Sequence, residues 1–475
     1  MFYRACLLFA LGTAVASAQP AVPDTPAGHA LSAWLQAFDR GDRDAYRQFL
    51  QNTFPSEMKD LDQDMQFREM TGGFDLRKIE VATPKKIVAL VQERLSDQFG
   101  RLTLQVADAE PERIAGVDVQ AIPRPAEFAL PHLSQSELTT ALHGKMDEEA
   151  AADRFSGAVL VAHGDTPIFA QAYGLADRER KISNTLDTRF RIGSMNKMIT
   201  GVAILQLVQA GKVALNEPFG KYVPDYPNKN LAAKVSIQEL LTHTGGTGDI
   251  FGPQFAAHRL QLRTLGDYVK LYGSRGPEFK PGNRWKYSNY GFILLGFVIE
   301  RVTGRSYYDY VHEHVYVPAG MASTGSEPED QPVAHRSIGY TKMNGDRLQP
   351  NADTLPYRGT SAGGGYSTVN DLLRFAIALR DHELLDSRYT EMLTSGKVDT
   401  PDGRYALGFA DQTINGTRCF GHSGGAPGMN GELEVCPGPD YVIAVLANLD
   451  PPAASRISDF ITSRLPSQEG APRRH

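Results

Sequence analysis

The stretch SMNKMITGVAIL occupies residues 194–205 and decides how the larger part of this chain is expected to fold. Its apolar side chains go nearly all the way round a helix, which is typical of a helix buried on every side. Gly211 supplies the usual stop after the last turn. Ser194 would lie at the positive end of the helix dipole, with Lys197 one turn on along the same face. Since burial lowers the pKa of an ammonium group, Lys197 could take the serine proton. The alternative is a helix-capping serine with a lysine that reaches solvent.

The Ser-x-x-Lys pattern also occurs at Ser56 and Lys59. There it leads into the polar run DLDQD, a solvated surface, so we interpret Ser56 as structural.

A Tyr-x-Asn pattern follows, with Tyr287 and Asn289 just before an apolar helix expected over residues 292–302. In an extended segment, side chains two positions apart point the same way, so these two could face one site. Tyr287 could then shuttle a proton and Asn289 could orient a substrate carbonyl. The pattern also occurs at Tyr226, where a core tyrosine in a turn is the plainer interpretation.

A His-x-Gly pattern occurs at His243 and again at His422, where an edge strand could line a cleft. His422 could stabilise charge near the tyrosine, and Gly424 and Gly425 would let a substrate approach the backbone. The N–H groups of Ser194 and Gly425 would then form an oxyanion hole. The alternative for His422 is a hydrogen-bonded residue with a structural role only.

In this order the three motifs resemble the serine β-lactamase and penicillin-binding-protein superfamily, especially its class C-related branch of D-aminopeptidases and family VIII esterases. Supporting segments are LLTHTGG at 240–246, PAGM at 318–321 and AGGGYST at 362–368. The resemblance covers roughly residues 136–465. It implies an α+β fold, with an antiparallel sheet flanked by helices and a helical subdomain. It also implies Ser194 as nucleophile, Lys197 and Tyr287 as the proton-handling pair, and Asn289 and His422 at the substrate, whereas residues 242–246 look like a packing motif.

One departure from the family pattern concerns the third motif, where β-lactamases and D,D-peptidases usually carry Lys-Thr-Gly. A histidine suits a substrate carboxylate less reliably at neutral pH than a lysine does. The resemblance therefore implies an exported serine hydrolase that forms an acyl-enzyme on an ester, amide or peptide, of the esterase or D-aminopeptidase kind. A β-lactamase or D,D-peptidase, and a non-catalytic penicillin-binding sensor, are the alternatives.

Two other hydrolase classes find less support. The segment GHSGG at 421–425 matches the nucleophile elbow of α/β-hydrolases, but that elbow needs a following helix and a later histidine. Residues 426–431 instead predict a loop before a strand, and only His475 comes later. His312 and His314 would point to different helix faces, and no His-Glu-x-x-His motif occurs, so we predict no metal and no organic cofactor.

The 475 residues exceed what one hydrophobic core usually serves, so we expect several domains. Residues 1–18 have the pattern of a signal peptide. Residues 19–125 combine helical spacing with four extended patterns and resemble the cystatin-like cone fold of the nuclear-transport-factor-2-like family, which suggests a scaffold or dimerisation unit. A linker over 126–135, a hydrolase-like domain over 136–465 and a tail over 466–475 complete the division.

Within 136–465 we expect a helix over 136–151 and a hairpin of strands at 157–162 and 168–173. A mainly helical region follows over 194–379. Strands at 418–422, 432–436 and 441–447 and a closing helix over 453–465 come last. Strands at both ends predict one sheet completed by distant pieces, with a site in the cleft beside the helical subdomain.

The composition is that of an ordinary soluble protein, with 41% hydrophobic residues and a net charge of -6. This balance argues against nucleic acid as a partner and leaves a small-molecule or peptide substrate. No segment after the leader is apolar enough to span a membrane, so we expect a periplasmic or secreted protein. The oligomeric state stays open.

Cys419 and Cys436 remain after leader cleavage, and an exported protein can form a disulfide between them. If His422 pairs with Glu432 across the expected hairpin, Cys419 faces Val435, one residue short of Cys436. A shift of one residue would bring the cysteines together, so a disulfide and two free thiols both stay open.

Overall fold

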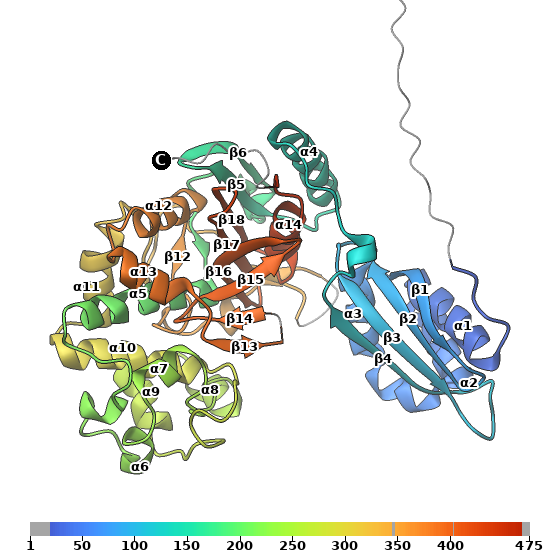
Figure 1. Cartoon of the computed structure of the whole chain (residues 1–475), viewed down its shortest axis with the longest axis horizontal. Helices are drawn as coiled ribbons and strands as arrows, with labels where there is room; N and C mark the ends of the chain where they lie inside the picture. Colours follow the sequence, from blue (N-terminus) through green and yellow to red (C-terminus); the bar gives the residue numbers. More distant parts are fainter. Residues whose placement is uncertain (1–19, 344–346, 402, 468–475) are drawn as a thin grey trace, which may run out of the picture. The chain divides into compact units, whose positions relative to one another are not determined.

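The structure is a computed structural model that describes residues 20–343, 347–401 and 403–467. The chain divides into two compact units, one up to Ala129 and one from Leu130 (Figure 1). This division falls within the linker predicted from the sequence. The predicted signal peptide, and residues 468–475 of the predicted tail, lie outside the described residues.

The first unit consists of three helices followed by a four-stranded antiparallel meander (Figure 1). Its elements are α1 (Pro26–Arg40), α2 (Arg43–Thr53), α3 (Leu61–Thr71), β1 (Phe74–Ala82), β2 (Lys86–Glu93), β3 (Phe99–Val106) and β4 (Ile114–Ile122). The rings of Trp34 and Phe38 in α1 stack against Phe74 in β1, with centroids 6.5 and 5.7 Å away. Helices before strands is the predicted order, and the cone-fold relationship stays a prediction.

The second unit is built on an eight-stranded antiparallel sheet in the order β13-β14-β15-β16-β17-β18-β5-β6. The strands are β5 (Gly157–His163), β6 (Thr166–Tyr173), β13 (Val398–Thr400), β14 (Gly403–Tyr405), β15 (Ala410–Ile414), β16 (Thr417–Ala426), β17 (Met429–Cys436) and β18 (Tyr441–Ala447). The early hairpin β5–β6 joins the late strands because β5 pairs with β18. Distant pieces therefore complete one sheet, as the sequence predicts.

Both faces of the sheet are covered, and successive residues of a central strand enter different cores. Val159 of β5 packs with α4 (Gln135–Ala151) and α14 (Ala453–Thr462). Its neighbours Ala158 and Leu160 pack on the opposite face with α5 (Asn196–Gln209), α10 (Asn289–Thr303) and α12 (Val369–Arg380). Burial on both faces explains why these strands are almost continuously apolar.

The helical region between the two sets of strands contains short helices besides α5, α10 and α12. They are α6 (Lys229–Ala232), α7 (Ile237–Leu241), α8 (Pro253–His258), α9 (Leu265–Tyr272), α11 (Tyr307–Val311) and α13 (Ser387–Thr394). The helices α6 to α9 gather at one end of the unit, beside α10 (Figure 1). Within the described ranges, no helix combines the length and the apolar character needed to cross a bilayer.

The expectation that His422 lies on an edge strand is wrong, because β16 lies between β15 and β17. The shorter β15 stops pairing at Gly421, whereas β17 pairs with β16 as far as Ala426. From His422 onward one side of β16 therefore has no neighbouring strand. The turn Gly193–Met195 packs there, so an interior strand still lines the site.

The two cysteines form a disulfide across the β16–β17 hairpin. His422 pairs with Leu433, not with Glu432, and this register brings Cys419 opposite Cys436 with 4.2 Å between their Cα atoms. The structure thus resolves the alternative that the sequence left open.

Candidate active site

Ser194 lies in a single 3₁₀ turn, Gly193–Met195, that leads directly into α5. Gly193 has a φ of 52°, in the left-handed region that favours glycine. A Cβ atom at Gly193 would lie 3.1 Å from the backbone nitrogen of Gly425, so the turn is pressed against β16. Ser194 itself is partly exposed, unlike its buried neighbours Gly193 and Met195.

Lys197 is fully buried, so the alternative of a lysine that reaches solvent is wrong. Its Nζ atom lies 3.3 Å from Ser194 Oγ and 2.8 Å from Asn289 Oδ1, and it also donates to the carbonyl oxygen of Ala362. Two of these three partners are carbonyl oxygens, which can only accept. A neutral amine would donate its two hydrogens to them, and its lone pair would face the Ser194 hydroxyl. This is the arrangement that a general base for serine needs.

The charge state of Lys197 suits that task. Burial lowers the pKa of Lys197 to about 7, although the nearby Asp249 carboxylate acts in the opposite direction. A substantial fraction of the amine is therefore neutral at physiological pH, whereas an ordinary lysine is almost wholly protonated. The protein prepares the base by removing it from water and providing acceptors that both forms of the amine can use.

Tyr287 precedes α10 and presents its ring to the lysine, with Nζ 4.7 Å from the ring centroid. Burial raises the pKa of Tyr287, while a hydrogen bond with Ser194 lowers it, and the net shift is upward. The phenol is therefore neutral at physiological pH. The structure therefore favours a neutral phenol that passes a proton on over a phenolate that acts as a base.

Asn289 begins α10 and uses both ends of its amide within the protein. Its Oδ1 accepts from Lys197, and its Nδ2 donates to the carboxylate of Asp249 at 3.0 Å. Asn289 is also mostly buried. The geometry gives it a role in holding Lys197, and contact with a substrate carbonyl stays a prediction.

His422 is buried, and both of its ring nitrogens have partners. Nε2 lies 2.9 Å from the hydroxyl of Tyr405, and Nδ1 lies 2.6 Å from the backbone oxygen of Ser423. The carbonyl must accept, so Nδ1 carries the hydrogen and Nε2 accepts from Tyr405. Burial and the charge of Lys197 lower the pKa of His422 to about 3, and the hydrogen bond to Ser423 only partly offsets them. His422 is therefore a neutral residue with no nitrogen left for a substrate in this arrangement.

The backbone N–H of Gly425 points toward the Ser194 turn. In antiparallel pairs, close pairs without hydrogen bonds alternate with wider hydrogen-bonded ones. The separation of 4.2 Å at Cys419 and Cys436 marks a close pair, and Gly425 opposite Asn430 has the same parity. The N–H of Gly425 thus turns away from β17 toward the side of β16 that faces Gly193. This placement suits the predicted oxyanion hole.

The sequence predicts that a substrate approaches the backbone at Gly424, but the structure shows a different contact there. A Cβ atom at Gly424 would lie 1.9 Å from the backbone oxygen of Ile192. The group that approaches Gly424 is therefore the chain's own backbone just before Ser194. This close approach sets the distance between the serine turn and β16, and a role for Gly424 in admitting substrate stays a prediction.

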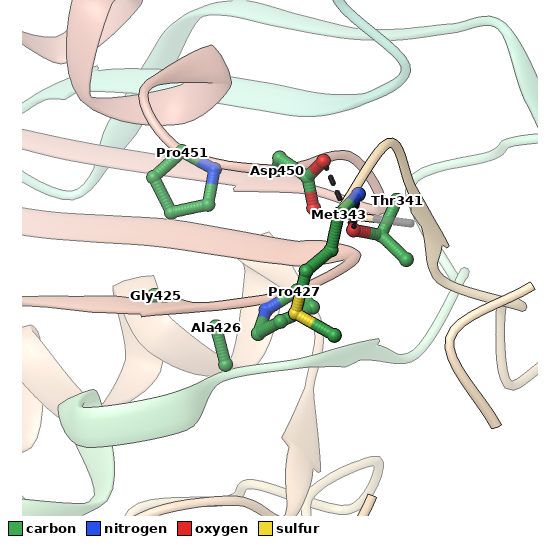
Figure 2. A pocket seen from close by; sticks show the side chains of 7 residues that line it. All are labelled: Thr341, Met343, Gly425, Ala426, Pro427, Asp450 and Pro451. Carbon is green, nitrogen blue, oxygen red and sulfur yellow. Dashed lines mark hydrogen bonds between the residues drawn. The ribbon is translucent and has the colours of Figure 1, made fainter. Parts of the chain in front are cut away.

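A shallow recess of about 420 Å³ adjoins Gly425 at the turn of the β16–β17 hairpin (Figure 2). It is lined mainly by apolar groups, from Thr341, Met343, Gly425, Ala426, Pro427, Asp450 and Pro451. The Asp450 carboxylate accepts from Thr341 Oγ1 and from the N–H groups of Lys342 and Gly428, and so joins three segments of the rim.

Three residues at the site were not among the site residues predicted from the sequence. His243, interpreted as part of a packing motif, packs against Tyr287 and Tyr405 with tilted rings and centroids 4.3 and 4.7 Å away. Its Nδ1 accepts from the N–H of Ser288, and burial lowers its pKa well below the ordinary value. Tyr405 and Asp249 belong to no motif. Only the Gly-rich loop that carries Asp249 gave a signal that could have found it.

The rival interpretations can now be examined. Ser423 is followed by the turn and strand of a hairpin, so the strand-turn-helix required for an α/β-hydrolase elbow is not present. Tyr226 is a core residue whose hydroxyl lies 3.1 Å from that of Tyr290, in agreement with its plainer interpretation. Ser56 lies on the first unit, in the 3₁₀ helix Pro55–Asp60. In the part of the chain that the structure describes, no group of His, Cys, Asp or Glu could hold a metal.

An antiparallel sheet covered by helices, with a serine and a buried lysine one turn apart beside a sheet strand, defines a serine hydrolase of the β-lactamase and penicillin-binding-protein superfamily. The chain belongs to the Beta-lactamase family, whose model matches residues 142–465. Its neighbours among solved structures have the same fold.

A penicillin-binding protein from Bacillus halodurans is 33% identical, with a TM-score of 0.61 over 67% of this chain and 97% of that one. A D-stereospecific amidohydrolase from Streptomyces is 27% identical, with a TM-score of 0.58 over 70% of this chain and 98% of that one. The putative penicillin-binding protein PbpX of Bacillus subtilis is 31% identical over 54% of this chain. The chain spans 62% of that relative's length.

Proposed function

We propose that this protein is an exported serine hydrolase that acts on an ester, amide or peptide, of the esterase or D-aminopeptidase kind. The observation that carries the proposal is the buried Lys197 amine 3.3 Å from the Ser194 hydroxyl, with a pKa brought to about 7 by burial. A lysine pKa lowered by burial beside a nucleophile is typical of catalytic groups. The likeness to a D-stereospecific amidohydrolase supports an amide as substrate.

The proposed reaction has two halves. Ser194 Oγ attacks the carbonyl carbon while its proton passes to Lys197 Nζ, and the N–H groups of Ser194 and Gly425 stabilise the oxyanion. The carbon–leaving-group bond then breaks, and the leaving group receives the proton from Lys197 by way of the Tyr287 hydroxyl. A water molecule attacks the acyl-enzyme in the second half, with the same groups in reverse, and releases the acid.

The His-x-Gly motif at His422 supports substrates of the esterase or D-aminopeptidase kind over β-lactams and D,D-peptides. The residue that replaces the family's lysine is a neutral, fully hydrogen-bonded histidine, so a substrate carboxylate would gain no ion pair from it. A periplasmic or secreted location is supported by the leader pattern and by the Cys419–Cys436 disulfide, since disulfides persist in oxidising compartments.

Intact mass after exposure to a fluorophosphonate, a penicillin or a short acyl ester tests the proposal, alongside hydrolysis of p-nitrophenyl acetate. We expect a fluorophosphonate adduct on the wild type, none on Ser194→Ala, and loss of hydrolysis in that variant. Equal hydrolysis by the two proteins refutes a Ser194-based enzyme. A stable penicillin adduct without turnover of any ester favours the sensor alternative.

A further inference from the structure

Asn430 of β17 joins the start of α14 to the strand that carries the predicted oxyanion donor. The residue is 2% exposed, and both ends of its amide are bonded. Its Nδ2 donates to the backbone oxygen of Gly424 at 2.9 Å, and its Oδ1 accepts from the N–H groups of Ala454 at 2.6 Å and Ser455 at 3.1 Å. The two N–H groups can only donate, so the amide oxygen must face α14 and the amide nitrogen must face Gly424.

These bonds supply the helix with a cap that its own segment cannot provide. The first N–H groups of a helix have no partner within it, and a side chain just before the helix usually accepts from them. Pro452 stands in that place before α14 and has no polar side chain. Asn430 therefore caps α14 from β17, and the cap fixes the direction in which its Nδ2 points.

The Gly424 carbonyl belongs to the same peptide unit as the Gly425 N–H. This unit is planar, and in a trans peptide the oxygen and the hydrogen point in opposite directions. Bonds that hold the oxygen on the β17 side therefore hold the N–H on the other side, toward the serine turn. Gly424 is paired with Gly431 of β17, and Asn430 adds a second donor at the same oxygen. In the described sheet Gly425 has no strand partner on the other side, because β15 stops pairing at Gly421.

Packing leaves this peptide unit with a glycine on each side. A Cβ atom at Gly424 would lie 1.9 Å from the backbone oxygen of Ile192, and one at Gly425 would lie 2.9 Å from Cγ of Pro451. Glycine restrains its neighbouring peptide units less than any other residue does. The direction of the Gly425 N–H therefore depends on the bonds at the Gly424 oxygen, including the one from Asn430.

The donors of this network also run head to tail. The α14 N–H groups donate to the Asn430 amide, the Asn430 amide donates to the Gly424 carbonyl, and the Gly425 N–H remains to donate to an oxyanion. Each hydrogen bond in such a chain polarises the next, so the last N–H becomes a stronger donor. The positive end of the α14 dipole lies at the start of the chain and acts in the same direction.

We propose that Asn430 is a positioning residue of the oxyanion hole, which couples the first turn of α14 to the Gly424–Gly425 peptide and holds the Gly425 N–H on the oxyanion. This inference rests on the proposed function, because it concerns the oxyanion that forms when Ser194 attacks a carbonyl carbon. Removal of an oxyanion-hole donor costs about 10² to 10³ in kcat, so loss of the residue that orients and polarises one should cost at least about tenfold.

The test uses Asn430→Asp, which keeps an oxygen for the α14 N–H groups but replaces the donor to Gly424 by an acceptor. We expect kcat for p-nitrophenyl acetate to fall at least about tenfold while KM changes by less than about twofold, because the oxyanion forms only on the way to each transition state. Ser455→Ala is the matched control. It removes a hydroxyl that donates to Glu432 at 2.8 Å and lies 3.4 Å from Asn430 Nδ2, but it keeps the backbone N–H that Asn430 accepts. Its urea midpoint should fall, and its kcat should equal that of the wild type.

A second measurement is the inhibition constant of phenylboronic acid, whose boron bonds to a serine oxygen and gives a tetrahedral anion that resembles the transition state. We expect its affinity to fall in Asn430→Asp by about the same factor as kcat/KM and to stay unchanged in Ser455→Ala. A role in stability alone would move neither quantity in a folded variant. Asn430→Ala removes the donor without adding a charge, should show the same losses, and carries the test if Asn430→Asp does not fold.

The possible results separate this inference from the proposed function. A folded Asn430→Asp or Asn430→Ala with wild-type kcat and wild-type affinity for the boronic acid overturns the inference although the enzyme is active. An equal loss of kcat in Ser455→Ala overturns it as well. Hydrolysis by Ser194→Ala at the wild-type rate would instead refute the proposed function, and the inference would be refuted with it.

Discussion

The pH dependence of acylation follows directly from the surroundings of Lys197. Burial lowers the pKa of this amine to about 7, and only the neutral form can accept the Ser194 proton. The other titratable groups at the centre of the site shift away from neutrality, since the pKa of His422 falls to about 3 and that of Tyr287 rises. The rate should therefore report Lys197 alone.

The expected profile can be worked out from that value. Below pH 7 the neutral fraction falls tenfold for each pH unit, so acylation at pH 5 should run at about 1% of its plateau rate. Above pH 8 the rate should level off. Lys197→Arg tests the assignment, because a guanidinium stays charged at every accessible pH. Loss of a general base costs about 10² to 10⁴ in rate.

The assay is the rate of fluorophosphonate labelling of Ser194 from pH 5 to 9.5, read by intact mass at constant ionic strength. Thermal denaturation of Lys197→Arg and of Lys197→Met shows whether each variant is folded. A midpoint near the ordinary lysine pKa, a flat profile, or a folded Lys197→Arg that labels at the wild-type rate would refute Lys197 as the base.

Three further predictions concern the surroundings of the site. Tyr405→Phe leaves Nε2 of His422 buried without a donor and should cost about 1–3 kcal/mol of unfolding free energy, measured by urea denaturation. Replacing Cys419 and Cys436 by alanine opens a loop with a sequence separation of 17 and should cost about 3 kcal/mol in the same measurement. Burial raises the pKa values of Glu432 and of Glu434 above the ordinary value of 4.5, so the stabilising contribution of these neutral carboxyls is complete below pH 4.5 and is lost as the pH rises above it. Glu432→Gln should therefore gain stability relative to wild type as the pH rises, and an equal difference in urea midpoint between the two proteins at pH 5 and pH 8.5 would contradict this.

The parts of the site that the sequence could predict are those set by local geometry. Ser194 and Lys197 meet because three residues make almost one helical turn, and Tyr287 and Asn289 flank the start of a single helix. The sheet could be predicted as well, because apolar runs of strand length stand on both sides of a helical region. Neither inference needs knowledge of how distant segments pack.

The parts of the site that could not be predicted from the sequence depend on packing between distant segments. Tyr405 reaches His422 because β14 and β15 lie beside β16 in the sheet, which nothing in the residues around Tyr405 indicates. The reason for Gly424 is the approach of Ile192 from a remote turn. The strand register decides whether the disulfide can form. His422 pairs with Leu433, and the sequence is equally compatible with a pairing shifted by one residue.

The pairing of β5 with β18 determines when the second unit can fold. Val159 lies opposite Val445, so the central part of the sheet cannot close until the chain has been synthesised as far as Val445. Pairing between segments this far apart in the sequence slows folding, because a long loop must close before the strands can form their contacts. A nascent or truncated chain would carry the serine and the lysine without the strand that faces them, and reactivity would appear only in the finished molecule.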